Sequence, residues 1–517
     1  MTAVALEATR IRVRGATVLA GAVLVVATLV AWWASMPYVV GVWHDDGVYA
    51  LLGRAIATGH GFHYTQLPGA PAATHYPPLY PIVLAAVWRL APSFPDNITA
   101  FLAVNAMFAG VAAVGAFRFV RARLAWRDEW AAAFALAVTL TTPVLALASA
   151  VLSEPLFLAG LWPALAAAER AVDPGATRRD AVLAGACAGA LMLVRTHAAA
   201  LVLALAIVLV TRRRSALAGW AVGAAVLMVL PWELWAVMAT PRVAAPLAGA
   251  YGSYLGWLAA GVREGGAAFV MATARLNLGE LWLLVQDRVL VADTWLPRIT
   301  ATLVLLALVG AGSWSAARRA PVVVCFLAAY LGVVVIWPYA PWRFLWAVWP
   351  VVLLLAAVGG WSSWQAMPTA AGRALVAGAV ALVAGGMVRT EAHAFATRAW
   401  SAPALQAGAQ ITPLVAWVGR HTQPSDMVLA EGEQVISLFT GRRAAPTARF
   451  SAREYVVPRT VEASAAELHE MLTLVPARYV LPLAPVQLQA AGTLGGRVPG
   501  LRAIGALPRS TVYEVLR

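Results

Sequence analysis

Long apolar stretches recur through this chain, and they constrain its fold more than any other feature. A stretch of about 20 apolar residues is what an α-helix needs to cross the hydrocarbon core of a bilayer. Only 12% of the 517 residues are charged, whereas a soluble globular chain carries about 25%. The sequence therefore predicts a polytopic α-helical membrane protein.

We expect about eleven transmembrane helices, beginning with an uncleaved first span because no Ala-x-Ala cleavage site is evident. The pair within 181–211 stays open because no polar loop separates its members. The expected spans lie near 16–36, 98–118, 130–150, 152–169, 181–195, 197–211, 216–238, 299–317, 320–337, 343–362 and 373–389.

Arginine placement orients these spans, since cytoplasmic ends are enriched in positive charge. The chain has no lysine, and its arginine clusters fall on one side of the membrane if the N-terminus is cytoplasmic. Topology thus explains most of the net charge of +14, which gives no reason to expect nucleic-acid binding. The clusters are Arg10/Arg12/Arg14, Arg118/Arg121/Arg123/Arg127, Arg178/Arg179, Arg212/Arg213/Arg214, Arg318/Arg319 and Arg373.

The predicted organisation is a transmembrane domain over 1–389 and a soluble external α/β domain over 390–517. Residues 37–97 are expected to form one external loop with surface helices, because the apolar segment 77–91 is short for a span. Residues 239–298 are expected to form a second external loop. Within the C-terminal domain we expect strands at 427–430, 478–481 and 511–516, and helices at 405–421 and 461–474.

Two adjacent carboxylates, Asp45 and Asp46, follow the first span at the membrane–water boundary. Carboxylates are costly to desolvate at that depth, so they indicate chemistry or ion binding. One would act as a general base that takes a proton from an acceptor hydroxyl, and the other would bind a cation or a sugar hydroxyl. The alternative is a helix N-cap, a position that aspartate favours.

His75 precedes Tyr76 and a proline-rich segment that includes Tyr80, and these two tyrosines are candidate substrate-binding residues. With Asp45 or Asp46, its imidazole would complete a site for a divalent cation. A lone histidine at the membrane surface is weak evidence for a metal site. The prolines alone explain why a surface helix would begin here.

Three further charged residues lie on the external side in this topology. Glu154 opens a span, where the helix dipole alone would favour a carboxylate. Arg195 and Arg343 run against the positive-inside bias, so we expect an anionic partner; the alternative is contact with lipid headgroups. Acids, a histidine and arginines at one membrane face suit a lipid phosphate that meets a hydroxyl acceptor. No Walker loop, dinucleotide-binding glycine motif or zinc-binding spacing is present in the sequence.

The ordered set of motifs resembles the membrane glycosyltransferases with the GT-C fold. It is most similar to bacterial relatives of the protein O-mannosyltransferases and the lipid A aminoarabinose transferase, of the family 39/83 type. The matching pieces are Asp45-Asp46, Pro77-Pro78-Leu79-Tyr80-Pro81, Leu152-Ser153-Glu154-Pro155-Leu156-Phe157, Arg195-Thr196, Leu230-Pro231-Trp232, and Arg343-Phe344-Leu345 leading into Pro350.

This resemblance implies an inverting transferase that uses a polyprenyl-phosphate-linked sugar on the periplasmic face of the bacterial inner membrane. Asp45 would match the catalytic base and Asp46 its acidic neighbour, while His75 would bind metal or substrate. Arg343 and Arg195 would hold the lipid phosphate. Some relatives have a lysine where this chain has Tyr76, so phosphate binding would depend on arginines. The acceptor, whether protein, lipid or glycan, stays open.

Two other functions remain open at the level of sequence. A transporter or flippase of a lipid-linked sugar would carry polar or broken helices near the bilayer midplane, often in repeated halves. No clear internal repeat is visible, and the ionisable residues gather at one face. A relative that acts only as a scaffold would need none of the acids.

Overall fold

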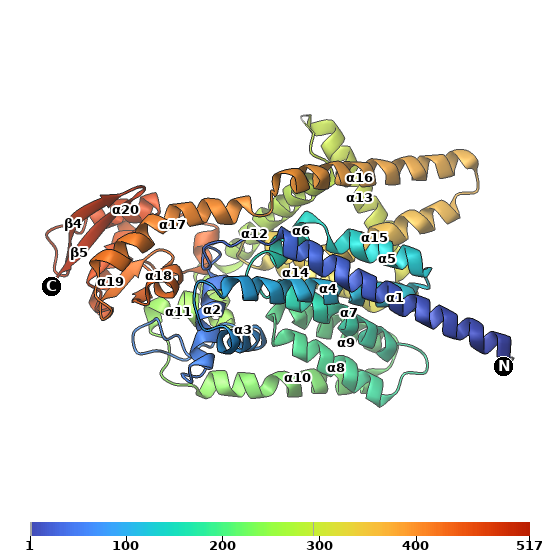
Figure 1. Ribbon diagram of the computed structural model, residues 1–517, viewed down its shortest axis with the longest axis horizontal. Helices are drawn as coiled ribbons and strands as arrows, with labels where there is room; N and C mark the ends of the chain where they lie inside the picture. The colour runs from blue at the N-terminus through green and yellow to red at the C-terminus, as the bar shows by residue number, and fades with distance from the viewer. Residues whose placement is uncertain (1–2, 293) are drawn as a thin grey trace.

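Helices dominate the structure and run roughly along one long axis (Figure 1). The computed structural model describes residues 3–292 and 294–517, with side chains from residue 15 onward. A small α/β unit caps one end of the helical bundle, far from the start of α1 (Ala3–Ala34). The arginines at 10, 12 and 14, which helped to orient the chain, lie outside the described side chains.

Seven helices in the described chain are long and apolar enough to cross a membrane. Six of them coincide with expected spans. The seven are the Gly15–Ala34 part of α1, α4 (Ile98–Leu124), α10 (Ser215–Met238), α12 (Tyr254–Val289), α13 (Trp295–Ala316), α15 (Trp342–Ala366) and the stretch Ala370–His421, which holds α16 (Ala370–Thr397) and α17 (Ala402–His421).

The other five expected spans are helices that are bent, charged or short. The span expected at 130–150 is divided into two helices that meet at 63°. The helix at 154–171 carries Glu154, Glu169 and Arg170, and the remaining three have 13 to 16 residues. In chain order the helices are α5 (Asp128–Thr139), α6 (Thr142–Ala148), α7 (Glu154–Ala171), α8 (Arg178–Met192), α9 (Ala199–Thr211) and α14 (Pro321–Ile336).

The prediction of an external loop over 239–298 is wrong for most of its length. Residues 254–289 form α12, a helix of 36 residues that departs from helical geometry at Gly266. Charged residues spaced along α12, among them Arg263, Arg275 and Glu280, interrupt its apolar stretches in the sequence. Before it lie only the short helices η2 (Ala245–Leu247) and α11 (Ala248–Tyr251).

Small residues allow the helices of the bundle to approach closely. A Cβ atom on Gly312 of α13 would lie 1.8 Å from the carbonyl oxygen of Leu355, and one on Gly359 of α15 would lie 1.9 Å from that of Leu308. Both positions require glycine because the opposing atoms belong to the backbone. Close backbone packing of this kind is a common device for joining helices in membranes.

Segment 37–97 contains two helices, as expected, namely α2 (Asp45–Ala57) and α3 (Leu79–Leu90), which pack together at the capped end of the bundle. Their buried apolar side chains, such as Leu51 and Leu84, form one cluster with Leu429, Leu468 and other residues of the C-terminal unit. The C-terminal unit therefore packs directly on the segment that carries the paired aspartates.

The C-terminal unit contains one five-stranded sheet in the order β2-β1-β3-β5-β4. Strands β2, β1 and β3 are parallel neighbours, and β5 pairs antiparallel with β3 and β4. The three expected strands and both expected helices are confirmed, while β2, β4 and two helices were not foreseen. The elements are β1 (Met427–Ala430), α18 (Glu433–Thr440), β2 (Arg443–Ala445), η3 (Ala452–Tyr455), α19 (Val461–Leu474), β3 (Tyr479–Leu481), α20 (Pro485–Gly492), β4 (Gly500–Leu507) and β5 (Ser510–Leu516).

Candidate functional site

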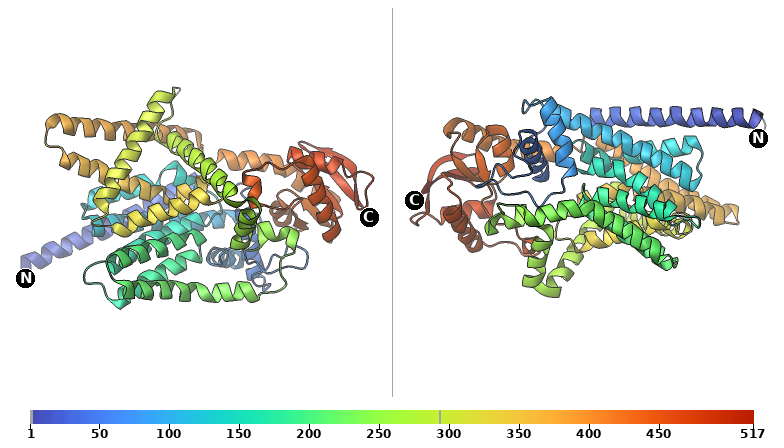
Figure 2. Two further views of the ribbon diagram at one scale, coloured as in Figure 1. Left: turned by 180° about the vertical axis from the view of Figure 1, so that it is seen from behind. Right: turned by 90° about the horizontal axis from the view of Figure 1, so that it is seen from below.

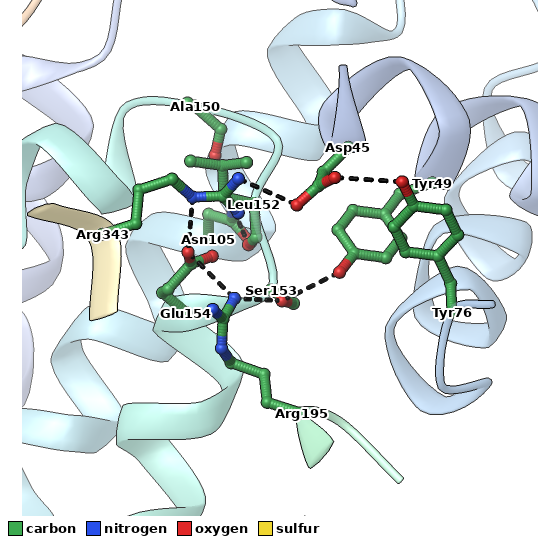
Figure 3. Close-up of polar contacts among 10 residues, drawn as sticks. All are labelled: Asp45, Tyr49, Tyr76, Asn105, Ala150, Leu152, Ser153, Glu154, Arg195 and Arg343. Atoms are coloured by element: carbon green, nitrogen blue, oxygen red, sulfur yellow. Dashed lines mark hydrogen bonds and ion pairs between the residues drawn. The ribbon is translucent and has the colours of Figure 1, made fainter. Parts of the chain in front are cut away.

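Four charged side chains from distant parts of the sequence meet at the capped end of the bundle (Figure 3). Arg343 bridges two acids: its Nη1 lies 2.8 Å from Asp45 Oδ2, and its Nε lies 2.8 Å from Glu154 Oε1. Arg195 Nη1 lies 2.9 Å from the same Glu154 oxygen. Two carboxylates and two guanidinium groups thus form a charge-balanced cluster.

Each of these residues lies where a helix begins or breaks. Asp45 is the first residue of α2, Glu154 is the first of α7, and Arg343 is the second of α15. Arg195 lies in the break between α8 and η1 (Thr196–Ala198). These helix ends converge at one end of the bundle, which brings together residues almost 300 positions apart.

Hydrogen bonds to neutral side chains hold the charged cluster in place. Tyr76 donates to Asp45 Oδ1 at 3.0 Å, and Arg195 Nη1 donates to Ser153 Oγ at 3.1 Å. The Ser153 hydroxyl also contacts the Tyr49 hydroxyl at 3.3 Å. Asn105 donates to the carbonyls of Ala150 and Leu152 at 2.6 and 3.1 Å, which fixes the turn before Ser153.

The surroundings of Asp45 favour its ionised form. Burial opposes charge on its carboxyl, but nearby positive groups, chiefly the Arg343 guanidinium with a further contribution from Arg195, together outweigh that effect and hold the pKa of Asp45 below its ordinary value. Asp45 is therefore a carboxylate at neutral pH, and it lines an open cavity.

Each of the two arginines has a hydrogen-bond donor that the described residues leave unpaired. Arg343 Nη2 and Arg195 Nε are buried without a partner in the described part of the chain. An unpaired buried donor is costly, so such groups call for a ligand. Guanidinium groups are well suited to the oxygens of a phosphate.

Asp46 has a different environment from its neighbour. Its carboxylate accepts hydrogen bonds from the Tyr38 hydroxyl at 2.9 Å and from the backbone N–H groups of Gly41 and Trp43 at 2.8 and 3.1 Å. Burial raises the pKa of Asp46 to about 6. It is fully buried and does not line the cavity, so its contacts organise the 38–46 turn that presents Asp45.

His75 is held as a neutral ring beside the cavity. Its Nδ1 lies 2.7 Å from the carbonyl oxygen of Gly252, which assigns the proton to Nδ1, and burial lowers its pKa to about 4. The ring packs against Tyr254, with centroids 3.7 Å apart. In the described chain no group of three or more His, Cys, Asp or Glu side chains could hold a metal ion. The expected cation therefore stays a prediction.

The cavity has a volume of about 390 Å³, within the range of small-ligand sites. Of the expected site residues, Asp45, His75, Tyr76, Arg195 and Arg343 line it. Glu154 lies behind the arginines. Tyr80 is fully buried and donates to Asn105 at 3.1 Å, away from the cavity lining.

Several lining residues were missed in the sequence. Tyr49, His197 and Tyr254 come from the membrane part, and Glu431, Glu433, Thr447 and Gln487 come from the C-terminal unit. The acidic Glu431-Gly432-Glu433 turn directly after a buried strand was the one available signal. Nothing in the sequence showed that this turn faces Asp45.

Comparison with solved structures identifies the fold. ArnT from Cupriavidus metallidurans, solved bound to undecaprenyl phosphate, matches with a TM-score of 0.54 and 14% identity over 96% of this chain and 98% of its own. The oligosaccharyltransferase of Archaeoglobus fulgidus, solved with zinc and sulfate, gives 0.51 and 14% over 89% and 67% of the two chains.

A structure of that archaeal enzyme, AglB, with an inhibitory peptide and a dolichol-phosphate gives a TM-score of 0.51 and 12% identity over 91% and 70% of the two chains. No protein-family model and no curated protein matches the sequence. The chain therefore has the GT-C fold of these membrane glycosyltransferases, as the sequence motifs predicted.

Proposed function

We propose that this chain is an inverting membrane glycosyltransferase. It moves a sugar from a polyprenyl-phosphate-linked donor to a hydroxyl acceptor on the extracytoplasmic face of the bacterial inner membrane. The observation that carries the proposal is the cavity in which ionised Asp45 lies beside two arginines with unpaired donors. The likeness to ArnT and AglB, which were solved with undecaprenyl phosphate and a dolichol-phosphate, supports a lipid phosphate as ligand.

In the proposed reaction Asp45 acts as the general base. The acceptor oxygen forms a bond to the anomeric carbon while the bond from that carbon to the phosphate oxygen breaks. The hydroxyl proton passes to Asp45, and the bonding electron pair leaves with the phosphate. A single displacement of this kind inverts the anomeric centre.

Arg343 and Arg195 stabilise the departing phosphate. Charge builds up on the phosphate oxygens as the bond breaks, and fixed guanidinium donors in a buried site lower the energy of that state. Glu154 ion-pairs with both arginines and holds them in place before the donor binds.

Binding of undecaprenyl phosphate to the purified full chain in lipid tests this assignment. Arg343→Lys and Arg195→Lys should each weaken binding at least tenfold, because lysine cannot reproduce the guanidinium fork. Arg179→Lys, at an exposed position on α8, is the control and should bind like wild type. Equal affinity in all four proteins would contradict the phosphate site.

A further inference from the structure

The cavity beside Asp45 has a second wall, which is built by the C-terminal unit. Its residues follow three successive parallel strands: Glu431 and Glu433 come after β1, Thr447 comes after β2, and Gln487 lies in α20 after β3. The carboxyl ends of parallel strands meet at one edge of a sheet, where open α/β sheets usually bind ligands. In this chain that edge faces the cavity that holds Asp45.

Two polar side chains of this wall are buried at the cavity. Gln487 is 3% exposed, and its Oε1 has no hydrogen-bond partner among the described residues. An unpaired buried amide oxygen is costly, and a ligand donor would satisfy it. Thr447 is 1% exposed and also lines the cavity.

The carboxylates of the wall leave acceptor capacity unused. Tyr251 donates to Oε1 of the buried Glu433, and no ion pair involves Glu433 in the described chain. Glu431 Oε2 accepts from the backbone N–H groups of Leu483, at 2.7 Å, and Ala484. The second oxygen of each carboxylate accepts no hydrogen bond from the described residues, so both oxygens remain available to the donors of a ligand.

The arginines that line this wall form ion pairs with carboxylates other than Glu431 and Glu433. Arg449 pairs with Glu470, and Arg459 pairs with Glu454 and Glu467. An anionic ligand would meet uncompensated carboxylates, whereas a ligand rich in hydroxyl groups would supply the missing donors. The stacked rings of Trp257 and Phe450, 5.3 Å apart, add a flat apolar surface to the same cavity.

We propose that this edge of the C-terminal sheet is the acceptor subsite, and that it binds a neutral, polyhydroxylated acceptor, a sugar. Gln487 and Thr447 recognise the acceptor, whose reacting hydroxyl points across the cavity to Asp45. This assignment rests on the proposed function, because it names the acceptor class of the same site.

Two readouts on the full chain in lipid separate donor chemistry from acceptor binding. The first is release of polyprenyl phosphate without acceptor, which reports transfer to water. The second is transfer to three acceptor panels: neutral mono- and oligosaccharides such as maltotriose, serine/threonine peptides, and sugar phosphates. The variants are Gln487→Ala and Thr447→Val, with Gln489→Ala as the matched control on the more exposed side of α20.

We expect transfer to neutral sugars, and an acceptor KM at least tenfold higher in Gln487→Ala and Thr447→Val. Donor hydrolysis should stay within twofold of wild type in both variants, which also shows that they are folded. Gln489→Ala should match wild type in both readouts.

Two results overturn the subsite while leaving the proposed function standing. One is donor hydrolysis with transfer only to peptides, only to sugar phosphates, or to no acceptor. The other is an acceptor KM in Gln487→Ala equal to that in Gln489→Ala. Absence of all donor turnover by wild type would defeat the proposed function and the subsite together.

Discussion

At the scale of single residues, the site depends on buried charges that neutralise one another. Glu154 is fully buried and pairs with both Arg195 and Arg343. Burying these charges is favourable only while each keeps its partner, since the penalty for removing ions from water is large. The cluster is therefore sensitive to loss of any one member.

Glu154→Gln should lower the free energy of unfolding by about 3–5 kcal/mol, because it leaves two buried arginines with less negative charge than they need. Thermal unfolding of the purified proteins measures this loss. The control is Glu129→Gln, which breaks the exposed Arg127–Glu129 pair and should cost less than about 1 kcal/mol. Similar losses in both variants would show that burial does not determine the value of these pairs.

Asp46 should control how activity depends on pH. Its pKa, raised to about 6 by burial, means that its carboxyl takes up a proton as the pH falls through that value. The protonated group accepts hydrogen bonds from Gly41 and Trp43 less well, so the turn that presents Asp45 loosens. The rate of wild type should fall below about pH 6, which gives its pH–rate profile an acidic limb. Asp46→Asn should be less active than wild type, and its profile should lack this acidic limb. A limb that survives in Asp46→Asn would assign the titration to another group.

The raised pKa of Asp46 also makes the stability of the folded protein depend on pH. Because the folded-state pKa of Asp46 is raised, the folded protein binds the proton more tightly than the unfolded chain does. Its contribution is therefore stabilising at low pH and is lost as the pH rises through about 6.

At the scale of elements, the turn before α2 is clamped by α18 of the C-terminal unit. Gln434 Nε2 donates to the Gly41 carbonyl at 2.8 Å, and the Gly41 N–H donates to Asp46. A Cβ atom on Gly47 would lie 2.4 Å from Gln434 Cγ and 2.7 Å from Gly41 Cα. The contact leaves no room for a side chain, so α18 helps to set the position of Asp45.

Gly47→Ala should lower turnover at least tenfold, because the added methyl group forces α18 and the Asp45 turn apart. Gly419→Ala is the control: a Cβ atom added to this exposed helical glycine would have nothing within 4 Å, and alanine should stabilise the helix slightly. Measuring kcat and thermal unfolding together separates displacement of the turn from general unfolding. Unchanged kcat in Gly47→Ala would contradict the clamp.

Much of the fold could be predicted from the sequence at this scale, because strong patterns are local. Six spans, the strand at 427–430 and the helix at 461–474 followed from hydropathy and periodicity. The helix α12 was not predicted, because charged residues spaced along it interrupt its apolar stretches. The site was harder to predict: Asp45, Arg195 and Arg343 stood out as charges at a membrane face, but the contacts of Gln434 and Gln487 depend on packing between distant segments.

At the scale of the whole molecule, the ends of the chain lie at opposite ends of the structure. The views from behind and from below place the α/β unit at one extreme and the start of α1 at the other (Figure 2). The charged cluster lies with the α/β unit, and the arginine clusters at 118–127, 212–214 and 318–319 belong to the other ends of their helices. From the positive-inside bias we therefore expect the site to lie on the external face.

A protease added outside intact spheroplasts should therefore remove a C-terminal epitope tag and spare an N-terminal tag. Permeabilised cells are the control, since both tags should be cleaved there. Protection of the C-terminal tag in intact spheroplasts would place the site on the cytoplasmic face and contradict the use of an external lipid-linked donor.

The most direct test of the transferase mechanism is donor turnover by the purified full chain in lipid. A panel of labelled polyprenyl-phosphate sugars would be supplied with a mixed acceptor extract, and release of polyprenyl phosphate would be measured. Wild type should turn over at least one donor, and Asp45→Asn should be slower by about 10²–10⁴-fold, the usual contribution of a general base, with unchanged folding. Equal release by Asp45→Asn, or no release from any donor by folded wild type, would contradict this mechanism.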